Sequence, residues 1–302
     1  TTAGNNVGVG YYALKANTTG TRNVALGANA LDANTVGGKN VALGMDALGT
    51  NIDGSRSVAV GDSALSAQEP ASAVDMYNTA VGHGAGAAVT TGVQNTLIGG
   101  IAGDVLTTGF NNVAVGFEAL SADTLGSQNT AIGTRALKTQ NFTSATNSYN
   151  TGVGYSAGTA ITTGVQNTYV GGLAGDAVVD GTNNVGIGFE ALSADHGSGE
   201  TAVGTRALKV STADNNTAVG LNALTANTTG TKNTAVGKDA GLAITTGDQN
   251  TALGTRSLQA TTTADHNTAI GEAALYANTT GASNTSVGSQ SLSANTTGGT
   301  NT

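Results

Sequence analysis

The sequence predicts an all-β fold, a parallel β-solenoid (β-roll) of about 17 rungs, and three observations lead to it. First, a phrase of the form N-[TV]-A-[VIL]-G recurs along the whole chain, usually at a spacing of 17. Second, β-branched and aliphatic residues alternate with small residues and amides before each of these glycines, as in a strand. Third, Gly or Asn recurs every few residues without a helical period, which argues against helix. One repeat unit, here called a rung, cannot bury an apolar face alone, so the rungs must stack with parallel strands.

The glycine that closes each phrase, here called the anchor, locates the strand of each rung. All 17 rungs have Val, Ile or Leu one residue before the anchor, and Val or Thr three residues before it. Two residues before the anchor, 15 rungs have Ala, Gly or Ser, and four residues before it 15 have Asn. Each rung is therefore expected to contain one short strand that ends at its anchor, as at 23–26. The anchors are Gly10, Gly27, Gly44, Gly61, Gly82, Gly99, Gly116, Gly133, Gly154, Gly171, Gly188, Gly204, Gly220, Gly237, Gly254, Gly271 and Gly288.

A core of constant volume is predicted from a substitution pattern that follows each strand. Four residues past the anchor, 12 rungs have Leu and five have Gly, and only in those five is the position three residues further on apolar. Every rung therefore keeps one large apolar side chain, although its position along the chain differs between the two groups of rungs. Close packing of a core requires such a constant volume. We expect the core to combine these residues with the strand face that carries Val or Thr and the aliphatic residue. The expected core residues are Leu14, Leu26, Leu31, Leu43, Leu48, Val60, Leu65, Val89, Leu106, Ile161 and Ile244.

The opposite strand face is kept small, and two interpretations fit it. In the first, it packs closely against the same surface of sister chains around a symmetry axis, which makes the chain a homo-oligomer. In the second, it is a tight inner corner of the coil that accepts only a methyl group. Leu97 and Tyr169 are the exceptions to the small size.

Parallel stacking in register also predicts ion pairs between rungs. Two residues past the anchor, an acidic residue in one rung is followed by Arg in the next rung three times. Adjacent opposite charges of this kind stabilise neighbouring strands modestly when exposed. The expected pairs are Glu118 with Arg135, Glu190 with Arg206, and Asp239 with Arg256.

The rungs form a single continuous repeat array over 1–302, with two insertions. Anchor spacing rises to 21 between Gly61 and Gly82 and between Gly133 and Gly154, which places loops near 68–77 and 139–149. Insertions in a solenoid emerge on one side, where binding can be added without disturbing the core. Their aromatic residues, Tyr77, Phe142 and Tyr149, either contact a sugar or receptor or simply seal ordinary bulges. Because the chain lacks an initiator Met and begins inside a repeat, we expect it to be a fragment of a longer chain.

The phrase N-[TV]-A-[VIL]-G-x-x-A-L, seen at 23–31, resembles the head repeats of YadA-like trimeric autotransporter adhesins. It is still more similar to the N-T-A-x-G-x-x-A-L-x-x-N-T-T-G repeats of phage tail-fibre and related surface-fibre proteins. The resemblance covers almost the whole chain and implies a left-handed parallel β-roll assembled as a homotrimer, within an elongated attachment structure. The repeat unit is longer than the adhesin-head unit, and a coiled-coil stalk and membrane anchor are absent from this sequence.

Composition and motifs argue against several other functions. A formal charge of −8 argues against nucleic acid as a partner, and no apolar run approaches a membrane span. Matches to the dinucleotide fingerprint, such as Gly8, Gly10 and Ala13, are products of the repeat without a βαβ unit. His83, His196 and His266 lie in different rungs without metal-ligand spacing, and no nucleophile, base and orienting carboxylate are assembled. We therefore expect no enzyme activity, no cofactor and no metal.

The expected function is structural: a rigid shaft or head of a phage tail fibre or bacterial surface adhesin that presents a receptor-binding region. The expected partners are copies of the same chain and a cell-surface glycan, and the expected location is the virion tail fibre or the cell surface. A self-assembling extracellular filament is the alternative, because residues 301–302 begin an eighteenth rung and neither end carries a capping repeat. Ice binding is a further alternative suggested by the many Thr residues. Against it, the regular Thr column is expected to share its strand face with the core.

Overall fold

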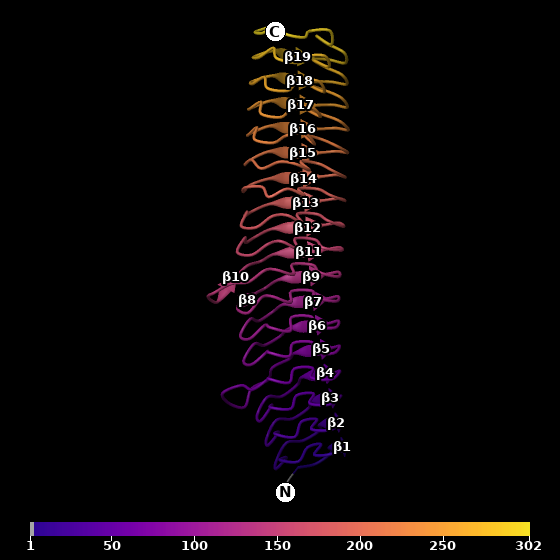
Figure 1. Ribbon diagram of the computed structural model, residues 1–302, viewed down its shortest axis with the longest axis vertical. Helices are drawn as coiled ribbons and strands as arrows, with labels where there is room; N and C mark the ends of the chain where they lie inside the picture. The colour runs from indigo at the N-terminus through magenta and orange to yellow at the C-terminus, as the bar shows by residue number, and fades with distance from the viewer. Residues whose placement is uncertain (1–2) are drawn as a thin grey trace. The chain divides into compact units, whose positions relative to one another are not determined.

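The computed structural model describes residues 3–302 and shows the predicted all-β parallel solenoid, with about 17 rungs and no helix in the described chain. The chain divides into two compact units, Thr1–Gly152 (unit 1) and Val153–Thr302 (unit 2). In both units each rung contributes one strand of three residues to the main sheet, and most of the rest of the rung is turns (Figure 1). The fold class predicted by the repeat is confirmed.

The main sheet of unit 1 is parallel and follows the order of the chain. Each strand pairs with the strand of the next rung, so that Val24 lies beside Val41 and Ala25 beside Ala42. Two shorter strands, β8 (Gly126–Ser127) and β10 (Thr146–Asn147), form a separate parallel pair. The strands of the main sheet are β1 (Val7–Val9), β2 (Val24–Leu26), β3 (Val41–Leu43), β4 (Val58–Val60), β5 (Thr79–Val81), β6 (Thr96–Ile98), β7 (Val113–Val115) and β9 (Thr130–Ile132).

Unit 2 repeats the same arrangement without insertions. Its strands also pair in parallel with the next rung, as Thr234 with Thr251 and Val236 with Leu253. The strand β11 (Thr151–Val153) spans the boundary of the two units. The strands of unit 2 are β12 (Thr168–Val170), β13 (Val185–Ile187), β14 (Thr201–Val203), β15 (Thr217–Val219), β16 (Thr234–Val236), β17 (Thr251–Leu253), β18 (Thr268–Ile270) and β19 (Thr285–Val287).

The anchor glycines are required by the close stacking of the rungs. Gly27 has a φ of 139°, and a Cβ built on it lies 2.4 Å from the carbonyl oxygen of Gly44 in the next rung. The same approach recurs at Gly44 and Gly61. A side chain at these positions meets the backbone of the neighbouring rung, which explains the requirement for glycine.

The turn after the anchor directs one large side chain into the coil. All 12 Leu residues four positions past an anchor have left-handed backbone conformations, for example Leu31 with a φ of 51° and Leu48 with a φ of 51°. That conformation costs a non-glycine residue roughly 1 to 2 kcal/mol. Leu31 and Leu48 are fully buried, and burying a leucine gains about 1.5 to 3 kcal/mol. Burial thus offsets the backbone strain.

The interior strand face is the small one, so the expected core face was wrong. Ala25, Ala42 and Ala59, two residues before their anchors, have no exposed surface, whereas Leu26 is 50 % exposed. Leu43 and Val60 are half-buried, as is Leu14 in the first rung. The remaining expected core residues are buried: Leu31, Leu48, Leu65, Val89, Leu106, Ile161 and Ile244. The reason is space, because the Leu side chain that follows the anchor fills the interior opposite the strand, and the coil accepts only a methyl group there. The inner-corner interpretation of the small residues is therefore confirmed.

The two large exceptions on the inner face show the same constraint. Leu97 lies over Gly86 and Gly103, and a Cβ on either glycine comes within 2.8 Å of a Leu97 methyl carbon. Tyr169 lies over Gly175 in the same way, with its ring 2.4 Å from a Cβ built there. In these rungs the leucine after the anchor is replaced by glycine, and the vacated space holds the side chain from the strand. Interior volume is conserved, as the substitution pattern predicted.

A ladder of buried asparagines, four residues before the anchors, joins the rungs. The Asn95 side chain accepts a hydrogen bond from the backbone N–H of Asn112 at 3.0 Å and donates to the Gly109 carbonyl at 2.9 Å. Asn112 repeats the pattern, accepting from the Asn129 N–H at 3.0 Å. Each amide therefore satisfies buried backbone groups in its own rung and the next, which such short strands leave unpaired.

Candidate functional site

The outer strand face is a regular and partly exposed surface of the described chain. It consists of the side chains one and three residues before each anchor, which are Val, Ile or Leu and Val or Thr respectively. Several of the aliphatic residues are well exposed, among them Leu26, Ile187 and Leu253 at 50 %, 38 % and 44 %. No position of this face carries a charge in any rung. An uncharged surface with a row of exposed aliphatic side chains is a candidate interface.

This arrangement corrects two expectations at once. The small residues do not form a surface between chains, because Ala25 and its counterparts lie inside the coil. The regular Thr column lies on the outer face instead of beside the core, so the expectation that counted against ice binding is wrong. In unit 2, seven of the eight strands from β12 to β19 have Thr at this outer position.

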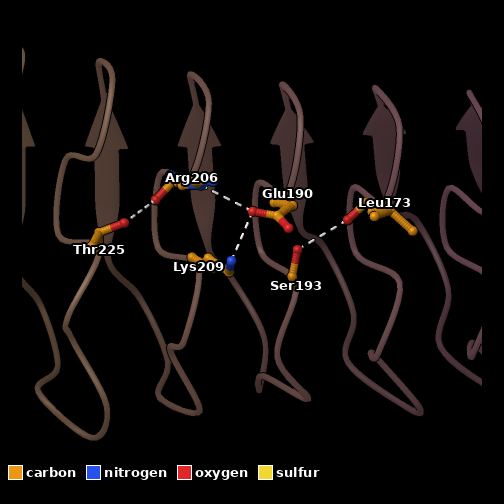
Figure 2. A network of polar contacts seen from close by, with 6 residues as sticks. All are labelled: Leu173, Glu190, Ser193, Arg206, Lys209 and Thr225. Atoms are coloured by element: carbon orange, nitrogen blue, oxygen red, sulfur yellow. Dashed lines mark hydrogen bonds and ion pairs between the residues drawn. The ribbon is translucent and has the colours of Figure 1, made fainter.

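Two ion-pair networks connect neighbouring rungs. In unit 2, the Glu190 carboxylate accepts Arg206 Nε at 3.0 Å and Lys209 Nζ at 2.7 Å (Figure 2). Ser193 donates to the Leu173 carbonyl at 3.0 Å, and Thr225 donates to the Arg206 carbonyl. Hydrogen bonds from Lys209 and then Arg206 lower the pKa of Glu190. The contacts cross from one rung to the next and fix the relative position of the turns.

Unit 1 contains the same network, and both networks include a lysine that sequence reasoning missed. Glu118 binds Arg135 at 2.9 Å and Lys138 at 2.7 Å, and these contacts lower its pKa. The sequence could have indicated Lys138, because it follows Arg135 by three residues, just as Lys209 follows Arg206.

The third expected pair differs from the structure. Arg256 contacts Glu272 in the following rung at 3.0 Å, whereas Asp239 accepts a hydrogen bond from Asn222 at 3.0 Å. The shorter aspartate side chain is engaged by the rung before it, and Arg256 reaches the longer glutamate of the rung after it.

The inserted segments leave unit 1 on the same side as the neighbouring turns and extend beyond them (Figure 1). Each is held at its base by a buried glutamine. Gln68 donates to Asn51 at 3.0 Å and accepts from Asn78 at 2.9 Å. Gln140 donates to Asp123 at 2.6 Å and accepts from Asn150 at 2.8 Å. Burial raises the pKa of Asp123, and the hydrogen bond from Gln140 opposes this rise.

The aromatic residues of the insertions fall into two classes. Tyr77 and Tyr149 are each 50 % exposed at corresponding positions. Phe142 is 5 % exposed, which excludes the first of the two interpretations, contact with a ligand, for this residue. Its apolar ring seals the loop, as the alternative interpretation held. Beside Tyr77, the Arg56 guanidinium lies 5.5 Å from the ring centroid, and Arg56 Nε contacts Asp75 at 2.8 Å.

Unit 2 contains buried titratable groups that the repeat pattern does not require. Glu200 replaces an asparagine of the ladder, and burial raises its pKa to about 8. Its Oε1 accepts from the Asn216 amide at 3.0 Å, while Oε2 is buried without a hydrogen-bond partner. His196 is also buried, which lowers its pKa, and its Nε2 lies 3.4 Å from the Tyr169 hydroxyl. The sequence offered one signal for Glu200, because this residue occupies a position at which 15 rungs have Asn.

Residues 3–302 contain no cluster of metal-binding side chains. His83 and His266 are not buried and lie far from His196 in sequence, and no three His, Cys, Asp or Glu side chains of this part of the chain are grouped to hold a metal ion. No helix in the described part of the chain has the length and hydropathy of a membrane span. No family model matches the sequence, and the search of curated proteins finds no similar protein.

Proposed function

We propose that the chain is a structural segment of an attachment fibre, the shaft or head of a phage tail fibre or bacterial surface adhesin. The observation that carries the proposal is the repeated pairing of every rung with the next within each unit. Backbone ladders, the buried asparagine column and the ion-pair networks all connect consecutive rungs. A fold in which each repeat is fixed by its neighbours suits mechanical support. The similarity of its repeats to those of surface-fibre proteins supports the same role.

The proposed fibre is a homo-oligomer, with a trimer favoured, that buries the outer strand face between copies. A standard interface takes about 800 Å² from each partner. The outer strand face recurs in every rung of the main sheet, so that several rungs can contribute side chains to such an interface. Because this face lacks charge, its burial carries no ionic desolvation cost.

Sedimentation of the purified chain tests the proposal. We expect a discrete oligomer, and the double variant Leu26→Lys with Leu43→Lys should weaken or abolish it because two cations enter the interface. Ile52→Lys is the matched control, since Ile52 is 39 % exposed but lies in a different part of the rung. A monomeric wild-type chain contradicts the assembly. Electron microscopy distinguishes short particles from the long fibres expected of a self-assembling filament, which is the alternative function.

Ice binding is a second candidate, favoured by the outer Thr column of unit 2. Successive Thr residues lie at the strand spacing of about 4.8 Å, and regularly spaced methyl and hydroxyl groups can order water in a lattice. This function predicts strong thermal hysteresis that is lost when Thr217, Thr234 and Thr251 are replaced together by Lys. Absence of hysteresis in the wild-type protein excludes it.

A further inference from the structure

A column of side chains runs along one corner of unit 1, at the position five residues before each anchor. In four consecutive rungs it holds Arg22, Lys39, Arg56 and Tyr77, all exposed and here called the basic column. Their φ angles are 60°, 62°, 63° and 53°, a left-handed conformation shared by this position in other rungs. Backbone hydrogen bonds hold the register, with Lys39 N–H donating to Thr21 at 2.9 Å and Arg56 N–H to Gly38 at 3.0 Å. The four side chains therefore follow one another at about the strand spacing of 4.8 Å.

The clustering of cations in the basic column is not explained by internal ion pairing. The whole chain has 11 Lys and Arg residues and a formal charge of −8. Within the described residues, Arg22 and Lys39 form no ion pair, and Arg56 uses only Nε in its contact with Asp75 at 2.8 Å. Like charges in adjacent strands repel one another. Asp75 thus neutralises Arg56, whereas Arg22 and Lys39 hold unneutralised positive charge at a cost to the fold.

The second insertion of unit 1 shows that the fold does not require this charge. The corresponding column there reads Gln94, Asn111, Gln128 and Tyr149, and Asn147 replaces Asp75. These positions have the same left-handed backbone, with φ between 51° and 63°. Both regions have a tyrosine and the same backbone conformation. The first region has three cations and one carboxylate at positions where the second has uncharged residues.

We propose that the basic column binds a linear acidic polysaccharide. Three cations along one line match the repeated carboxylates or sulfates of such a chain, and the free guanidinium N–H groups of Arg22 and Arg56 suit bidentate binding of these anions. Tyr77, half exposed with Arg56 near its ring, offers a surface for stacking a pyranose. Nucleic acid fits less well, because its binding depends on neutralising many phosphates, and the chain is acidic overall. The site spans four consecutive rungs of one chain and does not depend on the proposed oligomer.

Binding to three polymers with one backbone tests this assignment. Dextran, carboxymethyl dextran and dextran sulfate are compared by calorimetry, with oligothymidylate as a polyanion without sugar carboxylates or sulfates. We expect binding to at least one acidic dextran, weakened by salt, and none to dextran. The double variant Arg22→Glu with Lys39→Glu should bind roughly tenfold more weakly or not at all, since two attractive contacts become repulsive.

Matched variants separate the site from general effects of charge and folding. Lys232→Glu changes an isolated cation in the same corner position of unit 2 and should leave affinity nearly unchanged. Tyr77→Ala should weaken binding, whereas Tyr149→Ala should not. Circular dichroism melts establish that each variant is folded. Three results would overturn the proposal. They are absence of binding to both acidic dextrans, a double variant of Arg22 and Lys39 that binds as tightly as the wild-type chain, and tighter binding of oligothymidylate than of either acidic dextran.

Discussion

The inner and outer faces of the same strands are built from opposite kinds of residue. Ala25 and Ala42 face inward with no exposed surface, while Leu26, the next residue in the chain after Ala25, is 50 % exposed. Area alone favours the leucine inside, at about 25 cal/mol for each Å² buried. Forcing extra atoms into a filled core costs about 1 to 3 kcal/mol. The comparison teaches that the width of the coil, more than hydrophobicity, decides which face turns inward.

The largest expected difference in stability comes from placing a carboxylate first on the inside of the coil and then on the outer strand face. Leu31→Asp should destabilise the fold by about 3 to 5 kcal/mol, through a lost buried leucine and an unpaired buried carboxylate. Leu26→Asp should cost less than about 1 kcal/mol when measured below the concentration of self-association. Denaturant unfolding of the two variants gives both values. Equal losses would show that the assignment of the faces is mistaken.

A second test concerns Glu200, a titratable group on the inner face. Its pKa is raised from 4.5 to about 8 by burial, so between these values the folded chain retains a proton that the unfolded chain releases. Stability should therefore fall with rising pH by about 1.4 kcal/mol for each pH unit within this window. It should level off above about pH 8, where both states are ionised. Asp214 adds to the effect by repulsion.

The control for this pH dependence is Glu200→Gln, which keeps the shape and cannot ionise. The difference in unfolding free energy between wild type and variant, followed from pH 4 to 9, isolates Glu200 from Asp123 and His196. A constant difference across this range would show that Glu200 is ionised in the folded chain.

The asparagine ladder provides a smaller effect. Asn112→Leu should destabilise by about 1 to 3 kcal/mol, because the backbone N–H of Asn129 and the carbonyl of Gly126 lose their partners. Asn111→Gln, at the exposed neighbouring residue, should change little, since Gln94 and Gln128 occupy the same position of other rungs. Thermal melts of the two variants compare the inner and outer amides directly.

The smallest effect is expected on the exposed turns. Glu190→Gln removes both contacts to Arg206 and Lys209, and it should shift the melting temperature less than Asn112→Leu does, because water and salt screen these charges. Repeating the melt in high salt should reduce the difference further. A shift as large as that of Asn112→Leu would mean that the turns, and not the interior, hold the rungs together.

Much of the fold was predictable because the repeat reports positions that are constrained in every rung. The anchors, the strands and the exchange of Leu for Gly with Val89 or Ile161 follow from volume and stacking. The inward face was not predictable from hydrophobicity, since both Leu26 and Leu31 are aliphatic and only the coil geometry separates them. The recurrence of asparagine was visible in the sequence, but its structural role was not, because it depends on carbonyl groups 14 residues away.

The candidate sites were less predictable, for reasons of side-chain reach. The sequence predicted Asp239 as the partner of Arg256, but the structure places Arg256 against Glu272 of the following rung. Phe142 and Tyr149 lie in one inserted loop, yet one is buried and the other exposed. The sequence places Arg22, Lys39 and Arg56 at the same position of three consecutive rungs. That these side chains lie along one corner of the coil becomes evident only from the conformation of the turns.

The tolerance of the coil to changes in rung length has a consequence for engineering and for evolution. Val58 pairs with Thr79 across the first insertion, and Val185 pairs with Thr201 across a rung slightly shorter than usual, and both strands keep the alignment of ordinary rungs. Foreign peptides grafted between Ala71 and Asp75 should accordingly be displayed without shifting any strand. The scaffold can acquire new specificities by lengthening one loop at a time, while its repeating frame stays unchanged.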